Sequence, residues 1–287
     1  RPLLPPQARI LAVGSGGHPA LFQVGANALG FTGHPGVKAA IIEDLTWLGL
    51  DWDDGPVHQS ERIERYAEVL AELPVTRRDG AYEFEGRVIA RADGSPLYHL
   101  ATAVDDVDDA ITHVLRGRDH LSNTELQVAI IRAIGAQPPE YVHAPLLVFE
   151  DGAKVSKRKG DRATVGALCE EGFLPAAVCN ALALSLADFG TDEVMLNLAE
   201  MAERFDLARL HSADSQFDDA KLRWVSGEHI RAISDEQLAA ALSEFGLPEL
   251  PPPALIAART GGETLSECAE VARLLVGPPP PDDAAIE

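Results

Sequence analysis

The chain has 287 residues, of which 46% are hydrophobic and 24% are charged, an ordinary composition for a globular protein of one or two domains. It contains no apolar run of about 18 residues, the length that a membrane span needs, and it begins without the basic and apolar blocks of a secretory signal. The sequence therefore predicts a cytoplasmic location and no membrane partner.

Acidic residues dominate the charge balance. The chain holds 45 Asp and Glu against 24 Lys and Arg, a formal net charge of -21, and such a surface repels phosphate backbones. A role with nucleic acid therefore requires a local basic patch. The best candidate is 154–162, which holds five basic residues and one acid. This stretch is interpreted either as a phosphate-binding loop or as a solvated loop.

The three cysteines lack the Cys-x-x-Cys spacing of a structural zinc site, and their odd number argues against a disulfide framework. We expect Cys169, Cys179 and Cys268 to be small buried side chains. We expect no zinc and no other bound metal.

The first 50 residues combine a short buried strand with glycine and helical patterns. A proline-rich lead-in precedes a predicted strand at 9–13, which stops at the glycine loop 14–17. This loop either presents backbone N–H groups to a phosphate or is a plain turn before a helix at about 21–29. Apolar spacing predicts a further helix over 37–48, and Ser60 is expected to cap the next helix, which runs through Leu70.

Short strands and helices alternate as far as about residue 160. Strand patterns are predicted at 82–84, 88–89, 97–104, 111–115 and 146–149, with a helix at about 124–134. This alternation predicts an α/β fold with a mainly parallel sheet that includes 9–13, 111–115 and 146–149. The loop 154–158 is expected at the carboxyl ends of those strands. Beyond Thr164 the composition predicts helices, followed by a proline-rich acidic tail.

Three blocks in the middle of the chain, 98–106, 111–124 and 154–158, resemble the catalytic domain of glutamyl-tRNA synthetases in order and spacing. The resemblance covers about 9–235. It implies a class I synthetase-like Rossmann domain over 1–163, which binds nucleotide and amino acid, and a helical stem-contact-like domain over 164–287. It also implies that the acceptor-binding insertion is shortened to about 71–88 and that the anticodon-binding domain is absent.

The resemblance implies a role for each residue of the site. Lys154 and Lys157 lie in a loop that resembles the KMSKS signature, and their charges would neutralise the phosphates of ATP, used with magnesium. Ser156 and Arg158 would complete the nucleotide contacts. The amino acid would be bound by Arg9, Tyr98, Arg116 and His120, with Arg116 pairing with a carboxylate.

Structural roles are the alternatives for the same residues. Arg116 is alternatively an interior ion pair, and Tyr98 is alternatively a core aromatic residue. Asp105 and Asp106 resemble a metal pair, but we interpret them as the end of a strand and its turn. His99 and His113 are expected to be packed and hydrogen-bonded.

The sequence departs from the family at the other half of the ATP site. Family members carry a His-x-Gly-His signature after the first strand, whereas this chain has Gln23-Val24-Gly25-Ala26, which keeps only the glycine. Gly25 is therefore retained as a nucleotide contact, and both histidines are missing. The strand that supplies an acid near the substrate's ammonium group is also absent.

These departures lead to two hypotheses. In the first, the protein binds ATP or an adenylate and a glutamate-like amino acid, does not charge tRNA in the ordinary way, and acts as an ATP-dependent ligase or aminoacyl transferase in a specialised pathway. In the second, it is a non-catalytic binding or regulatory protein on a degenerate synthetase scaffold, with a protein partner. Both predict weak or no tRNA binding.

Overall fold

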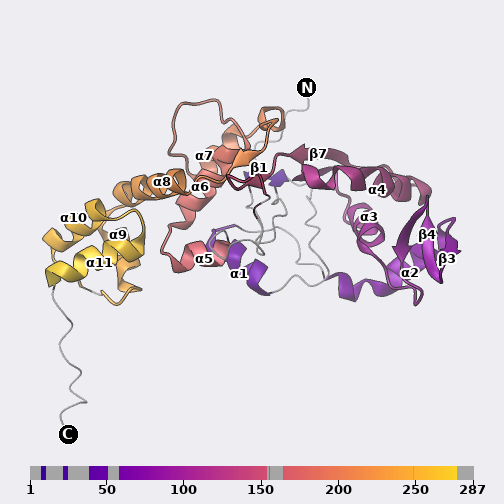
Figure 1. Cartoon of the computed structure of the whole chain (residues 1–287), viewed down its shortest axis with the longest axis horizontal. Coiled ribbons are helices and arrows are strands. Elements are labelled where there is room, and N and C mark those ends of the chain that lie inside the picture. The colour runs from indigo at the N-terminus through magenta and orange to yellow at the C-terminus, as the bar shows by residue number, and fades with distance from the viewer. Residues whose placement is uncertain are drawn as a thin grey trace, which may run out of the picture.

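The computed structural model describes residues 8–10, 22–24, 39–50, 58–153, 155, 164–247 and 249–276, and these form an α/β fold. Figure 1 shows helices α9, α10 and α11 gathered at one end of the molecule, with helix α2 and strands β3 and β4 at the opposite end. The prediction for the glycine loop 14–17 falls outside the described residues. Of the helix predicted at about 21–29 only residues 22–24 are described, and the prediction is wrong for them, because they form a strand that pairs with residues 8–10. No described helix is long and apolar enough to cross a membrane.

The centre of the fold is a β–α–β unit. Strand β6 (His113–Gly117) pairs in parallel with β7 (Glu140–Ala144), and Arg116 lies opposite His143 in the register. The 3-10 helix η2 (Arg118–His120) and helix α4 (Leu121–Ala133) make the crossover that a parallel pair requires. The predicted strand at 111–115 and the predicted helix at 124–134 are therefore confirmed, each with shifted ends.

The predicted single sheet is wrong in its composition. Strand β8 (Leu147–Val148) pairs in parallel with β9 (Ser215–Gln216), while β1 (Ala8–Ile10) pairs antiparallel with β2 (Phe22–Val24). Pro145 separates β7 from β8, and a proline has no N–H to donate to a ladder. The chain therefore leaves the β6–β7 pair at this residue and forms its next ladder with β9.

The segment 97–104, predicted as a strand, belongs to helix α3 (Tyr98–Asp108). Its residues 100 to 104 are all buried, because the helix lies in the core beside α2 (Ile63–Glu72) and α4. A short, continuously apolar run fits a buried strand and a buried helix equally well, so the pattern alone does not separate them. The prediction that Asp105 and Asp106 end a strand fails for the same reason.

Two tight turns shape the predicted insertion. Strands β3 (Thr76–Arg78), β4 (Ala81–Phe84) and β5 (Arg87–Ala90) form an antiparallel sheet, which confirms the predicted strand patterns there. Asp79-Gly80 and Glu85-Gly86 connect them, all four with positive φ, as two-residue hairpin turns require.

The helix expected over 37–48 is α1 (Ala39–Trp47), and the expected capping role of Ser60 is wrong. Residues Gln59–Glu61 form the 3-10 helix η1, and α2 begins at Ile63 after Arg62, which makes no side-chain cap.

Residues after Thr164 are helical, as predicted, apart from the two-residue strand β9 in the described part of the chain. The helices are α5 (Val165–Glu170), α6 (Pro175–Leu186), α7 (Leu198–Arg204), η4 (Leu207–Arg209), α8 (Asp219–Ala232), α9 (Asp235–Ser243), α10 (Pro252–Gly261) and α11 (Leu265–Val276). Side chains that accept N-terminal N–H groups start several of them, including capping boxes at Asn197 and Ser234.

Three hydrophobic cores organise the described residues. One packs α2, α3 and α4 against the antiparallel sheet, and another holds α9, α10 and α11 together. The largest joins Leu48, Leu115 and Ala144 to helices α5, α6 and α8. Cys179 and Cys268 are buried as expected, but Cys169 is exposed, because it lies on the outer face of the short helix α5.

Candidate functional site

Arg116 is a buried cation at the centre of the β–α–β unit. It lies on β6 with 5% of its surface exposed, and its guanidinium donates to Gln127 Oε1 at 2.6 Å and to Thr124 Oγ1 at 2.8 Å. Thr124 and Gln127 are three residues apart on α4 and so face the strand together. On the opposite side, the guanidinium carbon lies 4.8 Å from the centre of the Tyr141 ring.

The partners of Arg116 are neutral. The Thr124 hydroxyl, which accepts from Arg116, lies 3.1 Å from Nε2 of His143. Burial, and secondarily the charge of Arg116, lower the pKa of His143 and so favour its neutral form. Among the described residues Arg116 forms no ion pair, and the alternative of an interior ion pair is therefore wrong for this part of the chain.

Several buried polar atoms around Arg116 have no partner among the described residues. They come from one face of α3, from β6, from α4 and from β7: His99 Nδ1, Thr102 Oγ1, Asp106 Oδ2, Arg116 Nε, Gln127 Nε2 and Tyr141 Oη. Native interiors contain few such atoms, and each calls for water or a ligand. These atoms thus form a polar interior in which the described residues do not provide a hydrogen-bond partner for every group.

Asp106 is the acidic member of this interior. It is 3% exposed, and burial raises its pKa to about 7 although Arg116 acts in the opposite direction. A carboxyl group with this pKa holds its proton in part at neutral pH. Asp106 therefore leaves much of the positive charge of Arg116 uncompensated.

Tyr98 and His120 lie side by side. Tyr98 is the first residue of α3, and its ring centre lies 5.9 Å from that of His120 at the end of η2. Tyr98 is half-buried, so it is not a wholly enclosed core residue, and its ring also contacts that of His99 at 5.4 Å. The structure thus brings two predicted residues, Tyr98 and His120, together at the start of α3 and the end of η2.

The rest of the predicted site lies outside the described residues. This applies to Gly25, Lys154, Ser156, Lys157 and Arg158, and for Arg9 only its place in β1 is described. Val155 is described within the loop, and its N–H donates to the carbonyl of Leu147 at 2.9 Å. The loop therefore begins beside β8.

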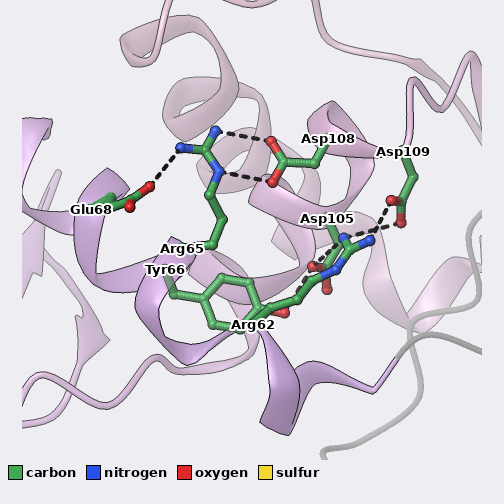
Figure 2. Close-up of polar contacts among 7 residues, drawn as sticks. All are labelled: Arg62, Arg65, Tyr66, Glu68, Asp105, Asp108 and Asp109. Atoms are coloured by element: carbon green, nitrogen blue, oxygen red, sulfur yellow. Dashed lines mark hydrogen bonds and ion pairs between the residues drawn. The ribbon is translucent and has the colours of Figure 1, made fainter.

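Asp105 belongs to a network between α2 and α3, shown in Figure 2. It accepts from Gln59 at 2.8 Å, Arg62 at 3.1 Å and Tyr66 at 2.8 Å, and Arg62 also reaches Asp109 at 2.6 Å. Arg65 pairs with Asp108 at 2.9 Å. These partners make Asp105 an anchor between two helices. In the described part of the chain, no three His, Cys, Asp or Glu residues are arranged to hold a metal.

The neighbours of Arg116 are not among the predicted site residues. Thr124 and Gln127 follow it at helical spacing, and Tyr141 and His143 alternate on the next strand, so both patterns were readable. Asp106 was noticed only as part of a pair. Asp106 is buried because α3 is a helix, and a strand over 97–104 does not predict this burial.

Comparison with known proteins gives the family context. The family model described as tRNA synthetases class I (E and Q), catalytic domain, matches residues 33–83 and 74–224. Glutamate–tRNA ligases of Albidiferax ferrireducens and of a Synechococcus species are each 34% identical to this chain, over 69% and 71% of it respectively. The chain spans 58% of the length of both relatives.

A likeness to solved structures supports the fold. A crystal structure of a glutamate tRNA ligase from Elizabethkingia meningosepticum, in complex with its amino acid, is similar with a TM-score of 0.70. The similarity covers 83% of this chain and 70% of that one, at 19% sequence identity. The β–α–β unit around Arg116 therefore lies within a chain of synthetase architecture.

Proposed function

The chain belongs to the class I tRNA synthetases of the glutamate and glutamine type, and from that premise we propose that it binds a glutamate-like amino acid and ATP in adjoining parts of one site. The observation that carries this proposal is the buried guanidinium of Arg116, held by neutral partners and left with an unpaired Nε. A buried cation of this kind is stabilised by an anionic ligand. The side-chain carboxylate of glutamate has the required charge and the geometry for a guanidinium.

The neighbours of Arg116 suit an amino-acid ligand. The guanidinium lies over the ring of Tyr141, and Tyr98 and His120, whose rings contact each other, are proposed to line the same subsite. Gln127 and Thr124 fix the plane of the guanidinium by two hydrogen bonds, which lowers the entropy lost on binding. We expect Arg9 to contribute to the same subsite from β1.

ATP is the second ligand of the proposal, on the basis of sequence. Lys154, Ser156, Lys157 and Arg158 supply three cations and a hydroxyl at the loop that follows β8. Such groups neutralise the charge that develops on phosphate oxygens during transfer, together with the magnesium that accompanies ATP. In the reaction proposed, an oxygen of the amino-acid α-carboxylate attacks the α-phosphorus, and pyrophosphate leaves.

Ordinary tRNA charging is not part of the proposal. The stretch 23–26 lacks both signature histidines, and losing one preorganised donor costs about 100- to 1000-fold in rate. We propose an ATP-dependent ligase or aminoacyl transferase in a specialised pathway, with an acceptor other than tRNA. The missing histidines also favour a second candidate, a non-catalytic binding or regulatory protein that retains the scaffold.

Ligand-induced stabilisation tests the proposal. We expect ATP and a non-hydrolysable glutamyl-adenylate analogue to raise the melting temperature, and glutamate to add to the shift given by ATP, because a ligand that binds only the folded state stabilises it. AMP and aspartate serve as controls for the phosphates and for side-chain length. Exchange of labelled pyrophosphate into ATP separates the two candidates, because only the enzyme supports it. A melting temperature indifferent to all these ligands would refute the proposal.

A further inference from the structure

A clamp of three residues joins the strand that carries Arg116 to the strand that precedes the lysine loop. Arg118, two residues after Arg116, forms an ion pair through Nη2 with Oδ2 of Asp214 and donates from Nη1 to the carbonyl of Ser212 at 3.4 Å. The other carboxylate oxygen of Asp214, Oδ1, accepts the backbone N–H of Leu146 at 2.7 Å. One side chain thus ties η2 to the residue just before β8.

The contacts around Leu146 show that this bond fixes more than one residue. Its carbonyl accepts the N–H of Ser215 at 2.9 Å, and Val148 accepts that of Phe217 at 2.8 Å, so β8 is held along the whole of β9. On its other edge, Leu147 accepts the N–H of Val155 at 2.9 Å. The clamp therefore acts on the short strand from which the lysine loop departs.

Besides these bonds to β9 and Val155, β8 has few backbone contacts to fix its position. It is two residues long, and Pro145 before it cannot donate to a ladder. A strand this short gains few ladder bonds, so a side chain that accepts the N–H of the residue before it has a large share in placing it. The Asp214 carboxylate is one-quarter exposed, which keeps the ion pair with Arg118 partly shielded from water.

We propose that Asp214 is a positioning residue that couples the amino-acid subsite on β6 to the nucleotide loop through β8. This inference rests on the proposed function and deepens it, since it names what holds the two halves of the site in register. Arg118 orients the Asp214 carboxylate, and Asp214 in turn orients Leu146. Neither residue touches a reacting atom.

Nucleotide affinity and amide exchange test the proposal together. In Asp214→Ala we expect the ATP dissociation constant to rise about fivefold to tenfold, the usual effect of losing one hydrogen bond, while glutamate affinity changes less than about twofold. Hydrogen exchange at Leu146 and Val148 should accelerate, and exchange within β6 should not. Asp214→Asn keeps an acceptor for Leu146 and should restore most of the ATP affinity.

Asp188 provides a matched control. Its Oδ1 also accepts a backbone N–H, from Gly190 at 2.7 Å, and its Oδ2 also faces an arginine, Arg209 at 3.6 Å. Asp188→Ala should leave ATP affinity and exchange at Leu146 unchanged.

Three results would overturn the inference in distinguishable ways. If the wild type binds ATP and Asp214→Ala binds it equally well, the positioning role is refuted and the proposed function stands. A wild-type protein that binds neither ATP nor glutamate removes both. Unchanged amide exchange at Leu146 in Asp214→Ala would also remove the clamp, whatever the ligands do.

Discussion

The hydroxyl of Tyr66 on α2 donates a hydrogen bond of 2.8 Å to Asp105 on α3, to the same carboxylate oxygen that Arg62 contacts at 3.1 Å. Tyr66 is 1% exposed, so this bond is made at the edge of a buried ring. It joins the polar network of Figure 2 to the core that α2 and α3 share. The contact therefore links α2 to α3, the helix that begins at Tyr98.

Tyr66→Phe should therefore destabilise the fold by about 1 kcal/mol, because the ring stays packed and one hydrogen bond is lost while Asp105 keeps Arg62 and Gln59. Urea denaturation measures the change in the free energy of unfolding. Tyr82→Phe is the matched control, since Arg77 stacks on that ring at 3.4 Å and a phenylalanine preserves the contact. Equal losses in the two variants would show that the Tyr66 hydroxyl has no special role.

Asp106 should make stability depend on pH with a sign opposite to that of an ordinary salt-bridged acid. Its pKa is raised to about 7 in the folded state, against roughly 3.9 for an unfolded chain. Between these values the native state holds a proton that the unfolded state releases, so the contribution of Asp106 to stability falls as pH rises.

The expected change is up to about 1.4 kcal/mol for each pH unit between roughly pH 4 and pH 7. It is measured as the difference in unfolding free energy between wild type and Asp106→Asn, which removes the titration. The exposed Asp192→Asn is the control. A difference that does not vary with pH would contradict the raised pKa.

Part of the fold could be predicted from the sequence because local patterns decide it. The helix at α4 follows from its periodicity, and the hairpins of β3, β4 and β5 follow from Asp79-Gly80 and the alternation around it. The strand prediction for α3 failed because long-range packing against α2 and α4 selects its conformation. The separate pairing of β8 with β9 depends on residues almost 70 positions apart in the chain, a distance that no local pattern reports.

The candidate site divides in the same way. Arg116, Tyr98 and His120 could be selected because they lie in recognisable blocks, and two of them do lie in ring contact. The orphaned polar atoms of Thr102, Asp106 and Tyr141 could not, since their burial is a property of the assembled α3, β6 and β7. The clamp at Asp214 could not be predicted either, because Asp214 binds the backbone N–H of Leu146 and not its side chain.

Gly172 should tolerate no side chain. Its φ is +80°, and a Cβ there would lie 2.7 Å from the backbone nitrogen of Ser266 at the start of α11. Gly172 also accepts the N–H of Leu265 at 2.7 Å, so the clash falls on a contact between two distant segments. We expect Gly172→Ala to cost about 3 kcal/mol or more, from strain and overpacking together.

Gly135 separates the two causes of that loss. Its φ is +78°, but a Cβ there meets nothing within 4 Å. Gly135→Ala should cost only the conformational strain, about 1 kcal/mol. Calorimetric melting of both variants measures the difference, and similar losses in the two would attribute the effect to φ alone.

Binding to tRNA should be very weak at about 150 mM salt. The formal charge of -21 opposes the approach of a phosphate backbone, and at this ionic strength a small basic patch is screened beyond about 8 Å. Fluorescence anisotropy with labelled total tRNA measures it, with an RNA duplex of equal length as the control for non-specific binding. Submicromolar binding selective for tRNA would contradict this prediction.

Variants in the two halves of the site should separate its ligands. Lys157→Ala should weaken ATP binding by about 1 to 3 kcal/mol, the usual contribution of a charged hydrogen bond, and leave glutamate binding unchanged. Arg116→Gln should weaken glutamate binding by a similar amount and leave ATP binding nearly unchanged, because its guanidinium faces Gln127, Thr124 and Tyr141.

Isothermal titration with each ligand alone measures both affinities, and the melting temperature controls for folding. Arg116→Gln should also lower the melting temperature, since Gln127 and Thr124 each lose the group that donates to them inside the protein. Lys157→Ala should not, because that lysine is proposed to contact phosphate oxygens. Equal weakening of both ligands by each variant would show that the two subsites are not separate. If neither variant changed the affinity for either ligand, the proposed synthetase-like site would be refuted. The hypothesis of a non-catalytic protein on this scaffold would remain.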